Sequence, residues 1–163
     1  MIRLCLLLII LISVNTRISY CQNAVPIRFA EAEYYWKHKH VDTLLIVNFW
    51  ATWCKPCVEE LPYFEQIQKD FLAKKVKVIL VSQDDPKQLD SRVNAFIRKK
   101  KLQSEVWLMT ESDPNTWIDA VDVNWTGSIP ATLIVKPNGS YAGFHEQSLN
   151  YEELKSLIHP LLP

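Results

Sequence analysis

The sequence of 163 residues lacks an excess of charge of either sign, because 18 lysine and arginine residues balance 18 aspartate and glutamate residues. It also lacks a basic stripe or a cluster in which basic and aromatic residues alternate; the run at 98–101 (RKKK) is typical of the solvated end of a helix. Nucleic-acid binding needs such a positive surface, and we therefore expect no nucleic-acid partner. No internal repeat or low-complexity tract is present, and the 48% hydrophobic content suits one globular domain with an ordinary core.

The sequence also lacks an apolar segment long enough to cross a membrane as a helix. Residues 4–14 are mostly apolar and follow Arg3, but a spanning helix needs about 20 such residues. A short positive start, an apolar stretch and a polar end are typical of a secretory signal peptide. We therefore predict a signal peptide at 1–21 and a single globular domain at 22–163, with a permanent membrane anchor as the alternative for the first segment.

Cys21 leaves a second processing route open. Residues 18–21 (ISYC) are similar to a bacterial lipoprotein signal, in which a lipidated cysteine becomes the first residue of the mature chain. Tyr20 departs from that pattern, because a small residue is preferred before the cut. Cleavage without lipid and a lipid anchor at Cys21 are both retained, and both place the domain in the cell envelope, periplasmic or membrane-anchored outside the cytoplasm.

Cysteine is scarce, and the four cysteines do not form a structural framework. Cys5 and Cys21 fall in the predicted signal segment, which leaves Cys54 and Cys57 as a single CxxC pair. A bridge that closes so small a loop adds little entropic stabilisation. No second CxxC supplies the four ligands that a structural zinc ion needs, so we expect no metal. The pair is therefore predicted to serve chemistry.

Apolar spacing and turn signals predict an alternation of helices and strands. Helices are expected at 29–39, 57–74, 89–97, 114–121 and from 150 to before 160, and strands at 44–50, 76–81, 106–109, 131–135 and 140–144. Residues 137–139 (PNG) predict a hairpin turn between the last two strands. Asn150 with Glu153 predicts a capping box, and Pro62 is expected to kink its helix. This order predicts an α/β fold with a mixed sheet, parallel early and antiparallel at the end.

The WCKPC motif at 53–57 follows a buried strand and begins a helix. The N-terminus of a helix carries partial positive charge and unpaired N–H groups, which stabilise a thiolate at Cys54. Lys55 adds a positive side chain, and Pro56 occupies an early helical position where its missing N–H is harmless. Cys54 is therefore predicted to be the attacking thiolate, and Cys57, one turn further in, the resolving thiol.

The stretch FWATWCKPC (49–57) resembles the thioredoxin superfamily, most closely its TlpA/ResA-type envelope thiol-disulfide oxidoreductases, and the resemblance spans roughly residues 29–158. It implies a thioredoxin-like fold, with helices on both faces of a mixed central sheet. Residues 127–132 (GSIPAT) are similar to the family's loop whose proline has a cis peptide bond and packs against the cysteines. The resemblance thus implies a cis bond between Ile129 and Pro130, and pairing of the Ile129 backbone with a substrate strand.

Two departures from the parent patterns concern the proton acceptor and the N-terminal region. Thioredoxin has a buried aspartate where this sequence has Asn48, which cannot ionise. Glu60, three residues after Cys57 on the same helix face, matches a glutamate of the ResA-type reductases. A partly buried carboxyl there has a raised pKa and can move the proton of the resolving thiol. A solvated Glu60 is the alternative, and Glu59 is the expected surface residue.

The second departure lies in the segment that precedes the first predicted core strand. TlpA/ResA-type proteins commonly begin with a β-hairpin, whereas residues 30–40 (AEAEYYWKHKH) indicate a single helix. His38 and His40 at the end of this helix are expected at the surface, without a metal.

The tryptophans other than Trp53, and the aspartate pair at 84–85, are expected to have structural and not catalytic roles. Trp50 should pack below Trp53, which is assigned to the substrate-facing surface. The remaining tryptophans, expected in the core or in loops, are Trp36, Trp107, Trp117 and Trp125. Asp84 and Asp85 are expected to cap the helix that follows them and not to form an acid–base pair.

These observations predict a monomeric extracytoplasmic thiol-disulfide oxidoreductase that needs no cofactor besides its own dithiol. The predicted site residues are Cys54, Cys57 and Glu60 for catalysis, and Trp53, Lys55, Pro56, Ile129 and Pro130 for substrate binding. The substrates are disulfide-containing envelope proteins, with apocytochrome c and misoxidised proteins as equal candidates. A reductase in oxidising surroundings must be recharged, and the family resemblance implies a membrane electron donor for this step.

The intervening Lys-Pro pair favours the reducing direction, because strong oxidants of the superfamily more often carry histidine there. An oxidase or isomerase of the same fold is the nearest alternative. A non-catalytic interaction module and a metal-delivery module are alternatives of another class. A peroxidase of the peroxiredoxin kind shares the fold class but has no CxxC motif.

Overall fold

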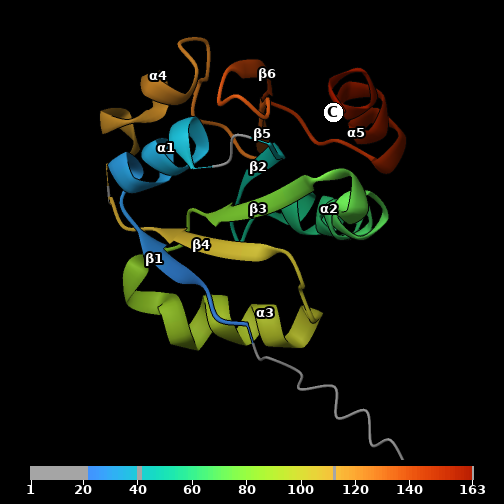
Figure 1. The fold of residues 1–163 in the computed structure, drawn as a ribbon. Coiled ribbons are helices and arrows are strands. Elements are labelled where there is room, and N and C mark those ends of the chain that lie inside the picture. Colours follow the sequence, from blue (N-terminus) through green and yellow to red (C-terminus); the bar gives the residue numbers. More distant parts are fainter. Residues whose placement is uncertain (1–21, 40–41, 112, 163) are drawn as a thin grey trace, which may run out of the picture.

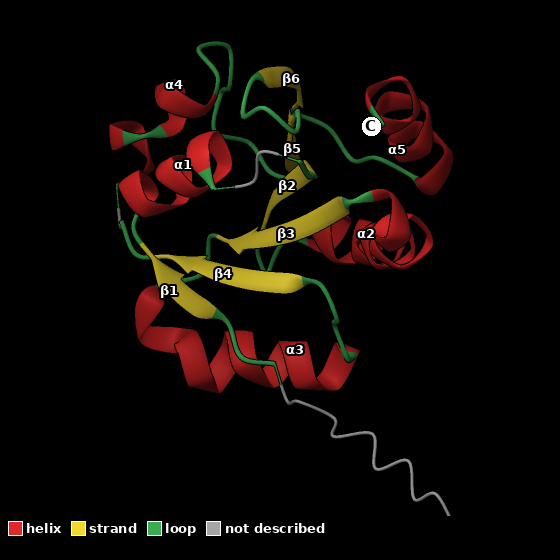
Figure 2. Cartoon of the chain, in the orientation of Figure 1, coloured by secondary structure: helices red, strands yellow, loops and turns green. Residues whose placement is uncertain are grey.

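The computed structural model describes residues 22–39, 42–111 and 113–162. A six-stranded sheet in the order β1-β4-β3-β2-β5-β6 forms the centre of the molecule (Figure 2). The strands are β1 (Val25–Ile27), β2 (Leu44–Trp50), β3 (Val76–Ser82), β4 (Glu105–Met109), β5 (Ala131–Val135) and β6 (Tyr141–His145). The first four strands are parallel, and β5 and β6 are antiparallel to their neighbours, so the predicted mixed sheet is confirmed.

Helices cover both faces of the sheet (Figure 1). They are α1 (Phe29–His38), α2 (Lys55–Phe71), α3 (Ala95–Lys100), α4 (Ile118–Val121) and α5 (Tyr151–Ile158). One apolar core joins α2, α3 and α5 to one face of the sheet, and a second core joins α1 and α4 to the other face. The resulting α/β sandwich is the thioredoxin-like arrangement that the resemblance implies.

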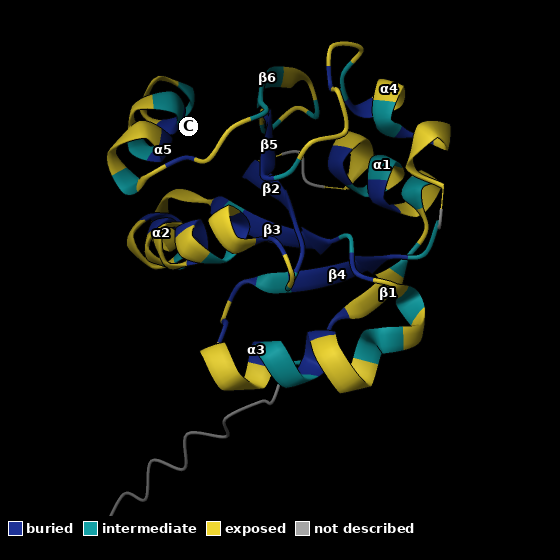
Figure 3. Ribbon diagram, turned by 180° about the vertical axis from the view of Figure 1, so that it is seen from behind, coloured by how far each residue is buried: buried dark blue, intermediate teal, exposed yellow. Residues whose placement is uncertain are grey.

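The strand β2 belongs to both cores because its side chains alternate between the two faces. Leu44 and Ile46 pack with α2, α3 and α5, whereas Leu45, Val47 and Phe49 pack on the opposite side. Every residue of this strand is buried, as expected of a parallel strand inside a sheet with both faces covered (Figure 3).

The sequence prediction missed one strand, and it treated as single helices two segments that each combine two types of helix. β1 has only three residues, includes Pro26, and pairs with β4 at the edge of the sheet, so no apolar alternation marks it. The segment predicted as one helix at 89–97 begins as a π-helix (Leu89–Asn94) and continues as α3. The segment at 114–121 likewise splits into a 3₁₀ turn and α4.

The start of α5 depends on the predicted capping box. The Asn150 side chain accepts hydrogen bonds from Glu152 N (3.0 Å) and Glu153 N (3.1 Å), and Asn150 N donates to the Glu153 carboxylate (2.8 Å). These bonds satisfy N–H groups that have no partner within the helix. The cap also fixes the residue just before it, Leu149, whose backbone N–H enters the site described below.

We expect Asn150→Ala to lower the free energy of unfolding by about 1 kcal/mol, because two helix N–H groups lose their acceptor. Denaturant titration followed by circular dichroism measures this change. Lys155→Ala in the same helix is the control, since its exposed ion pair with Glu152 (3.7 Å) contributes little, and it should change stability by less than about 0.5 kcal/mol. Equal effects of the two substitutions would contradict the assigned role of the cap.

Candidate active site

The two cysteines of the WCKPC motif lie at the start of α2, directly after the central strand. β2 ends at Trp50, and a turn closed by a hydrogen bond from Cys54 N to the Ala51 carbonyl (3.1 Å) leads into the helix. Cys54 is the N-cap residue of α2, and its Sγ accepts a hydrogen bond from Cys57 N (3.3 Å). Pro56 lies in the first turn, where a backbone N–H would have no intrahelical partner. The N-terminus of α2 thus directs N–H dipoles toward this sulfur.

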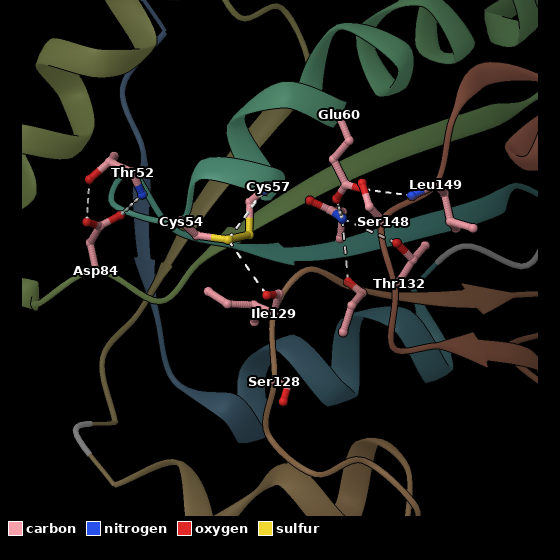
Figure 4. The surroundings of a disulfide bond; sticks show 12 residues. Thr52, Cys54, Cys57, Glu60, Asp84, Ser128, Ile129, Thr132, Ser148 and Leu149 are labelled. Atoms are coloured by element: carbon pink, nitrogen blue, oxygen red, sulfur yellow. Dashed lines mark hydrogen bonds between the residues drawn. A yellow bond between two sulfur atoms is a disulfide. The ribbon is translucent and has the colours of Figure 1, made fainter.

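The two cysteines form a disulfide bond and differ in their exposure. The S–S distance is 2.02 Å (Figure 4). Cys57 is completely buried, and Cys54 retains 6% of its surface. Trp53 is 60% exposed, and Lys55 and Pro56 are exposed beside it. Cys54 is therefore the sulfur that a partner molecule can reach, as its predicted role requires.

The loop before β5 lies against Cys54. The peptide bond between Ile129 and Pro130 is cis, as the resemblance implies, and the Ile129 carbonyl oxygen is 3.7 Å from Cys54 Sγ. Pro130 is buried and leads into β5, where Ala131 pairs with Phe49 of β2. Residues that are far apart in the sequence thus form one surface around the disulfide (Figure 4).

Side chains hold this cis-proline loop from its outer side. Trp125 Nε1 donates a hydrogen bond to the Ser128 carbonyl (2.8 Å). The Glu146 carboxylate accepts hydrogen bonds from Thr126 N (3.1 Å) and Ser128 N (2.9 Å). These bonds precede Ile129 in the chain and fix the direction in which its backbone approaches the disulfide.

Glu60 is buried and hydrogen-bonded. Only 1% of its surface is exposed, and its carboxylate accepts hydrogen bonds from Asn48 Nδ2 (2.8 Å), Ser148 Oγ (3.0 Å) and Leu149 N (2.8 Å). Burial raises the pKa of Glu60, and the three hydrogen bonds oppose this rise only in part. The alternative of a solvated Glu60 is wrong, and Glu59 is the exposed neighbour, as predicted.

Asn48 links the Glu60 carboxylate to the sheet. It lies on β2, is fully buried, and its Nδ2 also donates to Thr132 Oγ1 (3.2 Å) on β5. Its Oδ1 has no hydrogen-bond partner among the described residues. Because an amide and a hydroxyl do not ionise at neutral pH, Glu60 is the group of this network that can accept or release a proton.

Asp84 does not cap a helix, contrary to the prediction. It is 2% exposed, and its carboxylate accepts hydrogen bonds from Thr52 N (2.9 Å), Thr52 Oγ1 (2.6 Å) and Ser82 Oγ (2.8 Å). Asp85 alone has the predicted role, because it caps the short helical turn that follows. Asp84 instead ties the loop after β3 to the turn that precedes the cysteines (Figure 4).

A groove of about 660 Å³ opens beside this surface. It lies between the WCKPC turn, the loop after β3, the segment after β4 and the cis-proline loop. Its apolar lining consists of Trp53, Met109, Trp117, Ile118, Trp125 and Ile129. The charged residues Asp84, Asp85, Lys87 and Glu111 also line it. A groove of this composition, next to the accessible sulfur, suits an extended polypeptide with an apolar side chain.

The described part of the chain contains no group of three or more His, Cys, Asp or Glu side chains placed to hold a metal ion. His38 is exposed, and His40 lies outside the described residues. None of the described helices combines the length and the apolar character that spanning a bilayer requires. The predicted signal segment, including Cys21, also lies outside the described residues.

The sequence predicted the residues at the disulfide but missed those that hold them. The structure brings together around the disulfide the predicted residues Trp53, Cys54, Lys55, Pro56, Cys57, Ile129 and Pro130. The bond between Asp84 and Thr52 could have been anticipated, because both residues follow neighbouring parallel strands whose ends meet at one edge. The bond from Leu149 N to Glu60 had no sequence signal, because a backbone donor 89 residues away has no residue preference.

Residues 32–141 match the model of the AhpC/TSA family. The thiol-disulfide oxidoreductase ResA of Oceanobacillus iheyensis is 29% identical over 119 residues, which cover 73% of this chain and 57% of that protein. The ResA of Bacillus subtilis is 30% identical over 95 residues, which cover 58% of this chain and 48% of that protein. The chain thus spans about half to three fifths of the length of these relatives.

Solved structures share the fold. A thiol:disulfide interchange protein of Chlorobium tepidum superposes with a TM-score of 0.63 at 22% identity, over 76% of this chain and 83% of that one. StoA of Bacillus subtilis superposes with a TM-score of 0.54 at 22% identity, over 71% of this chain and 82% of that one. With a family model that matches most of its length and a thioredoxin-like fold, the chain belongs to the AhpC/TSA family.

Proposed function

We propose that this protein is an extracytoplasmic thiol-disulfide oxidoreductase that reduces disulfide bonds in proteins of the bacterial cell envelope. The observation that carries this proposal is the cysteine pair at the N-terminus of α2, where Cys54 alone is accessible and the cis-proline loop lies against it. Relatives named thiol-disulfide oxidoreductase support the same activity. The predicted signal segment supports the location.

The first step is attack by the reduced protein on a substrate disulfide. The Cys54 thiolate, stabilised by the helix N-terminus, forms a bond to one substrate sulfur. The substrate S–S bond breaks, and its second sulfur leaves as a thiolate that takes up a proton from water. The substrate segment pairs with the backbone of Ile129, and its side chains enter the groove beside Trp53.

The second step releases the substrate from the mixed disulfide. Glu60, one helical turn after Cys57, accepts the Cys57 proton as general base. The Cys57 thiolate then attacks Cys54 Sγ, and the bond between Cys54 and the substrate breaks. The substrate sulfur that was bonded to Cys54 leaves as a thiolate and is protonated. The substrate has gained two electrons and two protons, and the protein has returned to the disulfide form seen here.

The surroundings of the protein require a source of electrons for the next cycle. In an oxidising envelope, a membrane electron donor returns two electrons to the Cys54–Cys57 pair. The Lys55-Pro56 pair supports the reducing direction over the oxidising one. Apocytochrome c and misoxidised envelope proteins both belong to the proposed substrate class.

The reduction potential of the Cys54–Cys57 couple tests both the activity and its direction. We expect a value near that of thioredoxin, about −270 mV, whereas an oxidase would lie near about −120 mV. Equilibration against dithiothreitol, read by the fluorescence of Trp50 and Trp53, measures it. A couple that does not respond to the thiol buffer would overturn the enzymatic proposal and favour a non-catalytic interaction module.

The two cysteines have different proposed tasks, and serine substitutions separate them. Cys57→Ser should accumulate the mixed disulfide between Cys54 and a disulfide-containing peptide, because the resolving thiol is absent. Cys54→Ser should accumulate none, since Cys57 is completely buried. Mass spectrometry of the acid-quenched reaction detects the adduct. An adduct on Cys57 in the Cys54→Ser protein would reverse the assignment.

Glu60→Gln should slow release of the mixed disulfide about a hundredfold at pH 7, the lower range of general base catalysis. In the unaltered protein the rate should rise as Glu60 loses its proton, above the ordinary range of glutamate because burial raises the pKa of Glu60. In the variant this rise should be absent, because the glutamine side chain does not ionise. Single-turnover mixing from pH 5 to 9 records both profiles.

Glu59→Gln is the matched control, because it removes the same charge from an exposed neighbour and should leave the rate profile unchanged. Stability gives an independent readout. A carboxyl with a raised folded-state pKa stabilises the fold below its unfolded pKa, and this contribution is lost as pH rises through the folded value. Glu60→Gln should remove that loss. A rate profile identical to the unaltered protein would contradict the proposed base.

A further inference from the structure

Asp84 holds a buried negative charge beside the cysteine turn that none of the proposed steps uses. Its carboxylate accepts three hydrogen bonds, two from Thr52 and one from Ser82. None of the ion pairs among the described residues includes it. We propose that Asp84 is a positioning residue that fixes the Thr52–Cys54 turn and, through its charge, makes the Cys54–Cys57 couple more reducing.

The hydrogen bonds define the geometric part of this role. Thr52 donates both its backbone N–H (2.9 Å) and its hydroxyl (2.6 Å) to the same carboxylate, which fixes the position of its peptide and of its side chain. Thr52 lies inside the turn that the bond from Cys54 N to Ala51 O closes. A further bond, from Gln83 N to the Trp50 carbonyl (2.7 Å), joins the same two loops. The hydrogen bonds of Asp84 therefore help to fix the backbone of the turn that places Cys54 at the start of α2.

The burial of Asp84 defines the electrostatic part. The residue is 2% exposed, so water and salt screen the field of its carboxylate less than that of a surface charge. The N-terminus of α2 favours a thiolate on Cys54, whereas a negative charge close to the turn disfavours it. A less stable thiolate makes the reduced form less stable relative to the disulfide. The couple then gives up its electrons more readily.

Other charged groups face the same turn but are screened or neutralised. Lys55 is exposed and lies 3.8 Å from the exposed Glu59. Asp85 and Lys87 share one exposed loop, and both oxygens of Glu111 lie 3.0 Å from Phe29 N. Glu60 lies on the other side of the disulfide from Asp84 (Figure 4). Asp84 is thus the buried charge on the Cys54 side of the pair.

This inference rests on the proposed redox function, and its test keeps the two apart. Asp84→Asn removes the charge with little change in shape. We expect the equilibrium constant for reduction by glutathione to increase at least about threefold, which corresponds to a potential about 14 mV less negative. The pH midpoint for alkylation of Cys54 by iodoacetamide should fall by about half a unit in parallel.

Three further variants separate charge from structure. Asp85→Asn removes an equal charge from the exposed neighbour and should leave both values unchanged. Thr52→Val removes one hydrogen bond but keeps the Asp84 charge, and Asp84→Glu also keeps the charge; both should retain the equilibrium constant to within about twofold even where the melting temperature falls.

The outcomes are distinct for the inference and for the proposed function. A lower melting temperature of Asp84→Asn without a redox shift would overturn the inference, as would an equal redox shift in Asp85→Asn or Thr52→Val. If Asp84→Asn does not fold, a threefold redox shift in Thr52→Val or Asp84→Glu overturns it, and retention of the unaltered value in both supports it. The absence of a reversible redox couple in the unaltered protein would instead contradict the proposed function.

Discussion

The burial of β2 on both faces is the constraint on which the rest of the site depends. Each of its residues from Leu44 to Trp50 is packed between two layers of helices, so the end of the strand is a fixed point in the molecule. The cysteine turn, the start of α2 and the pairing with β5 all begin there. The apolar packing of β2 thereby fixes the position of the reactive cysteine pair. The N-terminus of α2 supplies the electrostatic surroundings of this pair.

Two buried carboxylates are retained next to this core because each accepts three hydrogen bonds, which come from two segments of the chain. Glu60 receives its hydrogen bonds from β2 and from the segment before α5, and Asp84 receives its bonds from the cysteine turn and from the end of β3. A buried carboxylate without such partners would be costly. The same bonds therefore join four segments of the chain around the disulfide, and the polar network is a structural element as well as a candidate for the chemistry.

The sequence predicted most of the fold because its core strands are apolar throughout and its helices carry clear caps, such as Asn150 and Pro56. It did not predict β1, since a three-residue edge strand contains too few residues for any periodicity. The reactive pair was predictable from local spacing, and the cis-proline loop from family resemblance. The burial of Glu60 was not predictable, because it depends on Ser148 and Leu149, which lie more than 80 residues further along the chain.

The arrangement of charges bears on the proposed reducing direction. Stabilisation of the Cys54 thiolate by a helix end alone favours the reduced protein, and a stable reduced form is the property of a strong oxidant. In this molecule the helix end is flanked by Glu60 on one side and Asp84 on the other (Figure 4). Burial raises the pKa of Glu60, whereas the Asp84 carboxylate accepts hydrogen bonds from Thr52 and Ser82. The balance between the helix end and these carboxylates then acts together with the Lys55-Pro56 pair on the proposed direction of electron flow.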